Sequence, residues 1–193
     1  MENNQDMSIR EAQPAYKRLY TVEDYHSWDE RFRSELYEGT LIVMEVPTRR
    51  HQGVLGEMFA LLHAFLKGKP CKVYIAPFSV RLSKNEESIF EPDIVVVCDK
   101  SILTERGCIG TPDFIVEILS PSTARMDKKL KYNKFQEAGV REYWIVDPER
   151  NLLEANVLTG DKYVMTVYDE SETAPVSILE GCKINLADVF GVE

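Results

Sequence analysis

The sequence predicts a mixed β-sheet with a helix on each face, in the α/β or α+β class. Short apolar runs, typical of strands buried on both faces, recur along the chain. Two longer segments have the apolar periodicity of amphipathic helices, and the order helix, strands, helix, strands favours a layered mixed sheet. The length of 193 residues and the 44% hydrophobic content fit one globular domain. We expect residues 1–15 to be a frayed polar tail and residues 16–193 to be the domain.

Four elements are expected in the N-terminal half. A capped short helix should cover residues 21–28, and a hairpin should cover residues 36–46 with its turn near residues 38–39. The first long helix should cover residues 51–66, and a strand broken at its proline should cover residues 72–82. The helix has one apolar stripe at i, i+3, i+4 spacing, formed by Val54, Leu55, Met58, Leu61, Leu62 and Phe65.

The C-terminal half should begin with two buried strands, within residues 91–97 and 112–120, joined by a loop that contains two glycines. A second helix is expected from Arg125 to Ala138, where Gly139 ends it. Further strands are expected at residues 141–146, 152–158, 162–168 and 176–179, and the chain finishes with the apolar segment 186–190.

Two of the apolar strands carry a carboxylate. Asp93 opens one run, and Glu117 lies inside the other. An unpaired carboxylate in an apolar setting costs several kcal/mol, so each must be paired, protonated or bound to a metal. On neighbouring strands Asp93 and Glu117 would be about 5 Å apart, whereas Asp113 is roughly 13 Å from Glu117 along one strand. The sequence therefore predicts a divalent metal between Asp93 and Glu117, and makes Asp113 a strand-entry residue.

The second helix places a lysine on its packed face. Phe135 and Ala138 should face the core, and stepping back one turn from Phe135 reaches Lys131, then Asp127. Lys131 therefore points along the packed face, either snorkelling to water or serving the carboxylates. Two carboxylates suit a hard cation such as Mg²⁺, and a nearby lysine would hold the attacking water and stabilise charge on a phosphate.

The amino-acid composition limits the classes of protein to which this chain can belong. The net charge of −9 argues against broad non-specific nucleic-acid binding but permits a local basic rim. No apolar stretch approaches about 18 residues and no signal peptide is present, so we expect a cytoplasmic protein with no membrane span. Because Cys71, Cys98, Cys108 and Cys182 form no C-x-x-C pair, free buried thiols are expected and a structural zinc is not.

The pattern of strand carboxylates and a helix lysine resembles the PD-(D/E)XK phosphodiesterase superfamily. It is most similar to the large bacterial family of putative restriction endonucleases, formerly a domain of unknown function. The resemblance covers roughly residues 20–190. Its matching pieces are Glu91 to Asp93, Pro112 to Thr123, Asp127 with Lys131, and Ala138 to Pro148. It implies a restriction-endonuclease-like fold, a central mixed β-sheet flanked by helices.

The resemblance also implies roles for single residues. Asp93 matches the motif aspartate, and Glu117 matches the glutamate of E-x-K. The superfamily lysine normally follows that glutamate by two residues, where this chain has Leu119. In this branch the lysine is displaced onto the following helix, which matches Lys131.

Two further residues match the site of this family. Glu38 matches an additional acidic residue, and His51 matches a position that is often polar. For His51 the alternative is a residue that merely begins the first long helix.

The function implied is a Mg²⁺-dependent endonuclease that hydrolyses phosphodiester bonds of DNA, with Mn²⁺ as a substitute metal. Phosphate contacts are expected from Arg125, Lys128, Lys129 and Lys134, against the alternative of a solvated helix face. A catalytically inactive nuclease-fold module for binding or assembly is the second hypothesis, and a hydrolase of small phosphoesters is the third. A homodimer is expected, because nucleases of this fold often cut duplexes as dimers, with the strands after Leu152 supplying a pairing edge.

Overall fold

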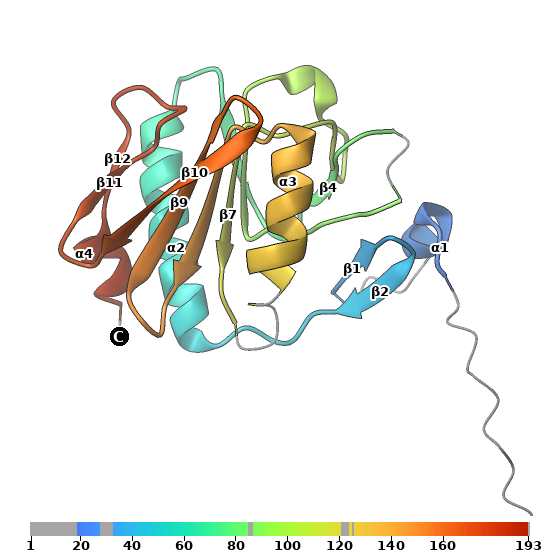
Figure 1. Ribbon diagram of the computed structural model, residues 1–193, viewed down its shortest axis with the longest axis horizontal. Helices are drawn as coiled ribbons and strands as arrows, with labels where there is room; N and C mark the ends of the chain where they lie inside the picture. Colours follow the sequence, from blue (N-terminus) through green and yellow to red (C-terminus); the bar gives the residue numbers. More distant parts are fainter. Residues whose placement is uncertain (1–18, 28–32, 85–86, 121–123, 125, 193) are drawn as a thin grey trace, which may run out of the picture.

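The computed structural model describes residues 19–27, 33–84, 87–120, 124 and 126–192, so the tail expected at residues 1–15 lies outside the described part (Figure 1). Its centre is a six-stranded sheet in the order β10-β9-β8-β7-β5-β3. These strands are β3 (Lys72–Ile75), β5 (Ile94–Val97), β7 (Phe114–Ile118), β8 (Glu142–Asp147), β9 (Leu152–Thr159) and β10 (Lys162–Asp169). Strands β7 and β8 run parallel and the other neighbours antiparallel, which confirms the mixed sheet.

The remaining elements surround this sheet. The helices are α1 (Val22–Ser27), α2 (Arg49–Leu66), a 3₁₀ turn η1 (Lys100–Ile102), a π-helical segment η2 (Met126–Lys131), α3 (Tyr132–Ala138) and α4 (Leu186–Phe190). The small sheets pair β1 (Ser34–Tyr37) with β2 (Thr40–Val43), β4 (Ser79–Arg81) with β6 (Gly107–Ile109), and β11 (Thr173–Pro175) with β12 (Lys183–Asn185). Among the described helices, none is both long and apolar enough to cross a membrane.

Helices α2 and α3 cover opposite faces of the central sheet (Figure 1). Alternate residues of a strand point to opposite faces. Ile94 and Val96 of β5 therefore pack in one hydrophobic cluster with the apolar stripe of α2. Val95 of β5 and Ile115 of β7 pack in a second cluster with Phe135 of α3. This alternation decides which face receives each polar side chain of these strands.

The expected hairpin is present, and its turn has the backbone that the sequence suggested. Glu38 and Gly39 both have positive φ, at 45° and 74°. Positive φ at both central residues is the requirement of a type I′ turn, which matches the twist of a two-stranded ribbon. The hairpin begins and ends earlier than expected, because β1 begins at Ser34 and β2 ends at Val43.

Two strand predictions were wrong in detail. The strand expected over residues 72–82 is divided between two sheets, because β3 joins the central sheet while β4 pairs in parallel with β6. The strand expected at Val176–Leu179 is a turn, in which the Leu179 amide donates to the Val176 carbonyl at 3.0 Å. Both of these side chains are buried in the α2-side cluster, so their apolar character reports burial and not extended structure.

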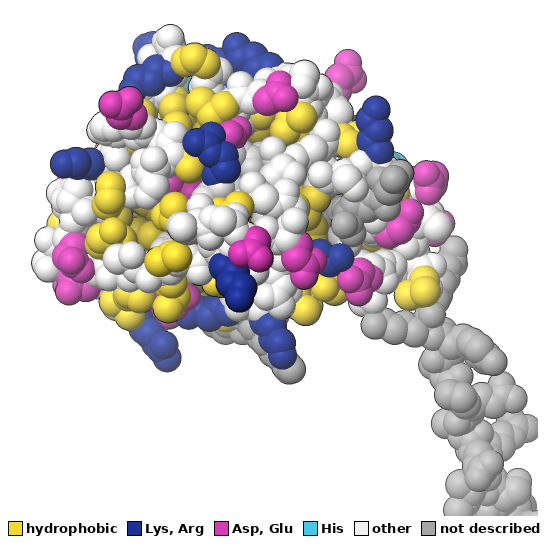
Figure 2. Space-filling view, turned by 45° about the horizontal axis from the view of Figure 1, so that its top comes forward, with side chains coloured by type: hydrophobic (Ala, Val, Ile, Leu, Met, Phe, Trp, Pro, Cys, Tyr) yellow, Lys and Arg dark blue, Asp and Glu magenta, His cyan; other side chains and the backbone are white. Residues whose placement is uncertain are grey.

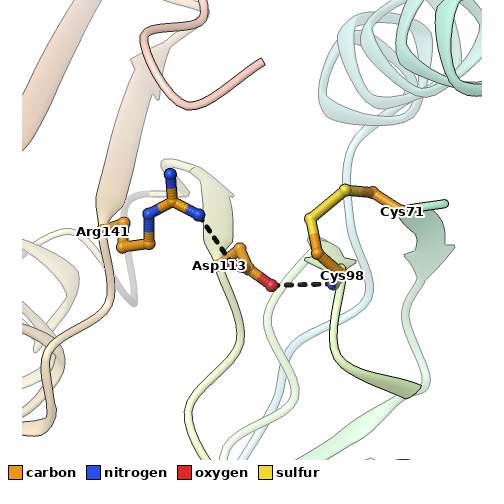
Figure 3. The surroundings of a disulfide bond; sticks show 4 residues. All are labelled: Cys71, Cys98, Asp113 and Arg141. Carbon is orange, nitrogen blue, oxygen red and sulfur yellow. Dashed lines mark hydrogen bonds and ion pairs between the residues drawn. A yellow bond between two sulfur atoms is a disulfide. The ribbon is translucent and has the colours of Figure 1, made fainter. Parts of the chain in front are cut away.

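The expectation of four free thiols is corrected by a disulfide between Cys71 and Cys98 (Figure 3). The β3–β5 register pairs Lys72 with Val97, which places Cys71 directly opposite Cys98 although 27 positions separate them in the sequence. A pairing made by register leaves no local pattern in the sequence. Cys108 and Cys182 are free and buried, as expected.

Asp113 lies beside this disulfide (Figure 3). Its Oδ2 accepts a hydrogen bond from the Cys98 amide at 2.7 Å, and its Oδ1 accepts one from Arg141 Nη1 at 3.1 Å. Asp113 thus links the ends of β5, β7 and β8. Its position before β7 agrees with the strand-entry role predicted for it.

Replacing Gly107 by alanine is expected to destabilise the fold by about 1–3 kcal/mol, the usual cost of overpacking. A Cβ at Gly107 would lie 1.8 Å from the backbone oxygen of Ser79, so β4 and β6 would have to separate. Gly56 of α2 is the matched control, because a Cβ there meets nothing within 4 Å and alanine should stabilise the helix by about 0.5–1 kcal/mol. Urea unfolding of both variants measures the difference, and equal changes would contradict the clash.

Candidate active site

Asp93 and Glu117 lie opposite each other on the α3 side of the central sheet. The β5–β7 register pairs Ile94 with Val116, and its continuation by one residue pairs Asp93 with Glu117. The amide of Ile118 donates to Asp93 Oδ2 at 2.8 Å, which holds the aspartate against β7. The two strands therefore bring together the two carboxylates that the sequence singled out.

Lys131 points inward, as the helix periodicity predicted, and its side chain is 1% exposed. Its Nζ lies 2.7 Å from Glu117 Oε1, 2.9 Å from Glu35 Oε1 and 3.2 Å from Asp127 Oδ1. Burial alone would lower the pKa of Lys131, but the charges of Glu117, Glu35 and Asp127 outweigh it and raise that pKa well above the usual value. The ammonium group is therefore a permanent buried cation, and the snorkelling alternative does not apply.

The backbone that carries Lys131 is not the plain α-helix expected from Arg125 onward. Residues Met126–Lys131 form a π-helical segment, and α3 continues from Tyr132. Such π segments are rare and recur at functional sites. Both Asp127 and Lys131 of this segment are buried, and Phe135 continues the same inward stripe. Arg125 itself lies outside the described residues.

The acidic residue that β1 contributes is Glu35, which the sequence analysis missed. Its side chain is 1% exposed, and its Oε1 accepts the Glu91 amide at 2.8 Å besides contacting Lys131. The expected residue, Glu38, lies in the hairpin turn with its side chain 59% exposed, and its Oε1 pairs with Lys134 at 3.1 Å. The structure therefore does not bring Glu38 into the cluster.

Glu35 reaches the cluster because the chain before Asp93 runs between β1 and β4. Leu36 and Ile89 exchange backbone hydrogen bonds of 2.9 and 2.7 Å, and Phe90 and Val80 exchange bonds of 2.9 and 2.8 Å. These pairings seat β1 beside the segment that leads into β5. The only local signal for Glu35 was its place one residue before the buried Leu36, on the other face of a short strand.

His51 joins the site from the first turn of α2. Thr48 caps this helix by accepting the His51 amide at 3.2 Å, and the imidazole is buried. His51 Nε2 lies 3.3 Å from Asp93 Oδ2. His51 Nδ1 is buried and has no hydrogen-bond partner among the described residues. The structure thus places His51 against Asp93 and not only at a helix start.

Carboxylates outnumber cations in this cluster. In the described part of the chain, Glu35, Glu117 and Asp127 contact the ammonium of Lys131, and the charge of Asp93 acts on Glu117. Burial raises the pKa of Glu117 well above its usual value; Lys131 opposes this shift, and the three other carboxylates add to it. Glu35 Oε2 is also buried with no hydrogen-bond partner in the described part of the chain. Among the described residues, the cluster therefore holds more carboxylates than ammonium groups.

This donor set fits a hard divalent cation held by few protein ligands. Mg²⁺ commonly takes one or two carboxylates and completes its shell with water and substrate phosphate. Asp93 and Glu117 supply two carboxylates on one face of adjacent strands. Within the described residues no group of three or more His, Cys, Asp or Glu side chains is arranged so that it could hold a metal ion.

The lysines predicted to contact phosphate lie on or next to η2 and α3. Lys128 Nζ pairs with Glu154 of β9, Lys134 pairs with Glu38, and Lys129 is exposed. On the face drawn in Figure 2, Lys and Arg side chains are interspersed with Asp and Glu side chains. This mixed distribution agrees with the negative net charge and leaves any phosphate contact a local one.

Sequence comparison finds relatives of this chain. Two uncharacterized proteins of Synechocystis sp. are similar to it. One is 27% identical over 115 residues, which cover 58% of this chain and 60% of that protein. The other is 22% identical over 153 residues, which cover 77% of this chain and 86% of that protein. The chain thus spans about three fifths of the first of these relatives.

A solved structure shows the same fold. The crystal structure of a putative nuclease of DUF820 from Anabaena variabilis matches with a TM-score of 0.73 and 20% identity, over 89% of this chain and 97% of that one. This similarity confirms the predicted fold class. A family model described as "Putative restriction endonuclease" matches residues 22–187, and the chain therefore belongs to the Uma2 family.

Proposed function

We propose that this protein is a divalent-metal-dependent endonuclease that hydrolyses phosphodiester bonds of DNA. The observation that carries the proposal is the convergence of Asp93, Glu117 and Lys131 in a buried cluster with excess negative charge. Family membership supports the reaction class. A cation between two carboxylates, beside a fixed ammonium, is the arrangement that phosphodiester hydrolysis needs.

Asp93 and Glu117 are the residues that would hold Mg²⁺, or Mn²⁺ in its place. The bound ion would supply Lewis-acid polarisation of a phosphate oxygen and lower the pKa of a bound water. His51 and the Ile118 amide both contact Asp93 Oδ2, and so orient the aspartate. Contacts of this kind, behind the ligands themselves, commonly tune metal affinity by about 10–100-fold.

Lys131 would act as a positioned cation and not as a base. Its raised pKa keeps the ammonium protonated, so it donates hydrogen bonds and accepts none. Glu35 and Asp127 hold it from two sides, which sets the ammonium against Glu117. From there it would orient the attacking water and stabilise negative charge that develops on the phosphate.

The test is cleavage of supercoiled plasmid with Mg²⁺ or Mn²⁺. Wild-type protein should cut, and Glu117→Gln should lower the rate at least ~100-fold, because the variant loses a metal ligand. Asp113→Asn is the matched control, since Asp113 precedes the same strand but contacts Cys98 and Arg141 instead of the cluster. Equal cutting by wild type and Glu117→Gln, or cutting that a chelator does not stop, would overturn the proposal.

Variants of Glu35 and Glu38, both on the hairpin, test which of these two glutamates belongs to the site. The structure places Glu35 in the cluster, whereas the resemblance implied Glu38. Glu35→Gln should reduce plasmid cleavage by about 10–100-fold, the size of effect expected for a group that orients site residues. Glu38→Gln should leave cleavage unchanged, because that side chain is exposed and paired with Lys134. A lower cleavage rate for Glu38→Gln than for Glu35→Gln would mean that Glu38, and not Glu35, belongs to the site.

A catalytically inactive binding or assembly module remains the second candidate. It is favoured by the way Glu35, Glu117 and Asp127 already neutralise Lys131 without any metal. In that case the cluster would be a structural ion network, and divalent metal would not stabilise the folded protein.

The expected homodimer stays a prediction. Strand β10 is the edge of the central sheet, and its Val164, Met165 and Val167 are exposed. An exposed edge strand with apolar side chains is a surface on which a second copy would pair.

A further inference from the structure

Strand β10 forms a long edge of the central sheet. It has 8 residues and pairs with β9 alone among the described strands, whereas β3, at the other edge, has 4. Three apolar side chains of β10 are exposed: Val164 by 56%, Met165 by 56% and Val167 by 49%. An open edge with exposed apolar side chains is a template for pairing with another chain, and native proteins usually shield it.

Side chains shield only the two ends of this edge. The Tyr163 amide donates to Gln136 Oε1 at 2.8 Å, and the Asp169 amide donates to Glu172 Oε2 at 2.9 Å. Both amides therefore point away from β9 and are already hydrogen-bonded. The ladder of a further strand would have to end at these two positions.

The centre of the edge keeps its backbone groups open. Amide directions alternate along a strand, so Met165 and Val167, two and four residues after Tyr163, also point their amides away from β9. No hydrogen bond joins either amide to another described residue. Thr166 lies between them, and its amide points toward β9. The edge therefore offers one short open ladder between two shielded ends.

We propose that a second copy of this chain covers the centre of this edge, with its β10 antiparallel to the first and a two-fold axis at Thr166. Met165 then lies opposite Val167 of the second copy, and symmetry repeats the pair. Each pair exchanges two backbone hydrogen bonds through the open amides. Tyr163 lies opposite Asp169, so the ladder ends where the amides are already bonded. A register that brought either residue into the ladder would have to break its side-chain hydrogen bond.

The apolar side chains agree with this register. Tyr163 packs in the α3-side cluster, so the side chains of Met165 and Val167 lie on the α3 side of the sheet as well. The register brings these two exposed side chains together across the axis. On the other side of the sheet it sets Val164 against Tyr168, which already packs on the α2-side cluster. Apolar cross-strand pairs of this kind stabilise a sheet.

Charge separates this register from the neighbouring symmetric one. An axis at Thr166 places Lys162 opposite Glu170 of the second copy, so opposite charges meet at both ends of the ladder. Moving the axis by one residue, to position 165, would place Asp161 opposite Asp169. Like charges directly opposite each other destabilise a strand pair. The sequence of β10 is therefore complementary to itself in one register.

This inference goes beyond the proposed function, because it assigns a partner and needs no catalytic activity. It gives the homodimer expected above a defined strand, register and symmetry. The axis is perpendicular to the joined sheet, so both candidate active sites lie on the same side of the dimer.

Thiol cross-linking of the full chain tests the register. Opposite residues of a non-hydrogen-bonded antiparallel pair have Cα atoms about 4.5 Å apart, which suits a disulfide. Thr166→Cys faces its own copy and should give a cross-linked dimer when an oxidant is added. Val164→Cys is the matched control, because its two copies would be roughly 13 Å apart along the strands. Wild type, whose free thiols are buried, gives the background. Equal cross-linking of the two variants, or none with Thr166→Cys, would overturn the proposal.

Sedimentation measures the dimer without a cross-link. Wild type should change from monomer to dimer as its concentration rises, because one pair of strands forms a small interface of the weak class. Val167→Lys should raise the Kd of the dimer at least ~10-fold, since a lysine on an edge strand opposes pairing. Val43→Lys is the control, because Val43 is 63% exposed but lies on β2.

Two sedimentation results would refute the proposal. Equal weakening by Val167→Lys and Val43→Lys would show that β10 is not the contact. A wild-type chain that stays monomeric up to about 1 mM would leave the edge to a strand of another protein and exclude the second copy as its partner. Neither measurement depends on DNA cleavage, so the dimer and the endonuclease stand or fall separately.

Discussion

Replacing Lys131 by methionine should destabilise the folded protein by about 3–5 kcal/mol at neutral pH, the usual cost of removing one partner from a buried ion network. The variant would leave Glu35, Glu117 and Asp127 without the ammonium that each now contacts within 3.2 Å. Methionine has a similar length, so the loss reflects charge more than packing. Urea unfolding of both proteins measures the change.

The pH dependence gives this prediction a second readout. In wild type the pKa of Lys131 is raised, so the stability that its charge contributes is present throughout the neutral range and is lost only as pH rises through the folded pKa. In Lys131→Met the abandoned carboxylates should take up protons as pH falls, so its deficit relative to wild type should shrink toward acid pH. Lys129→Met is the control, because Lys129 is exposed on the same segment. A deficit below about 1 kcal/mol, as for a surface ion pair, would contradict the network.

Divalent metal should stabilise the wild-type protein against unfolding by about 2.7 kcal/mol at a metal concentration 100 times its Kd. Asp93→Asn and Glu117→Gln should each abolish this gain, because the metal loses one of its two protein ligands. Thermal unfolding with and without Mg²⁺ or Mn²⁺ measures the effect, and about 1 kcal/mol corresponds to roughly 2–4 °C in a chain of this size. No stabilisation of wild type at millimolar metal would favour the inactive-module hypothesis.

The same experiment without metal, repeated across pH, reports on the proton linked to Glu117. Burial and neighbouring carboxylates raise the pKa of Glu117, so its charged form is less stable in the folded protein than in the unfolded chain. The stability linked to its proton is present below the unfolded pKa and is lost as pH rises through the folded pKa. Glu117→Gln cannot lose this proton, so its stability without metal should lack that pH dependence, while the lost charge contact with Lys131 Nζ at 2.7 Å should lower its stability. Asp113→Asn should show neither effect, since Asp113 lies outside the cluster.

Periodicity and strand spacing singled out Asp93, Glu117 and the inward direction of Lys131, whereas a functional role for Lys131 came from the resemblance. A carboxylate in an apolar strand and a lysine on an apolar helix stripe are local anomalies, because burial makes each one costly unless it is paired. His51 and the displacement of the lysine from the place of Leu119 came from the resemblance, and the structure sets His51 against Asp93.

Other features depended on contacts between distant segments. Glu35 enters the site only because residues 89–90 pair with β1 and β4, and Glu38 was the nearer match by resemblance. Register across β3 and β5 joins Cys71 to Cys98. The helix periodicity of the sequence did not predict the π-helical geometry of Met126–Lys131. Lys131 still points inward in this geometry, as it would in an α-helix.

The sequence by itself determined the mixed sheet, the two covering helices and the buried charges that need explaining, because these follow from the alternation and periodicity of apolar residues along one segment. Only the tertiary structure decided which carboxylates surround Lys131 and which cysteines are joined. Those features are set by strand register and by packing between segments far apart in the chain. The free energy of such contacts cannot be predicted from the residues of one segment alone.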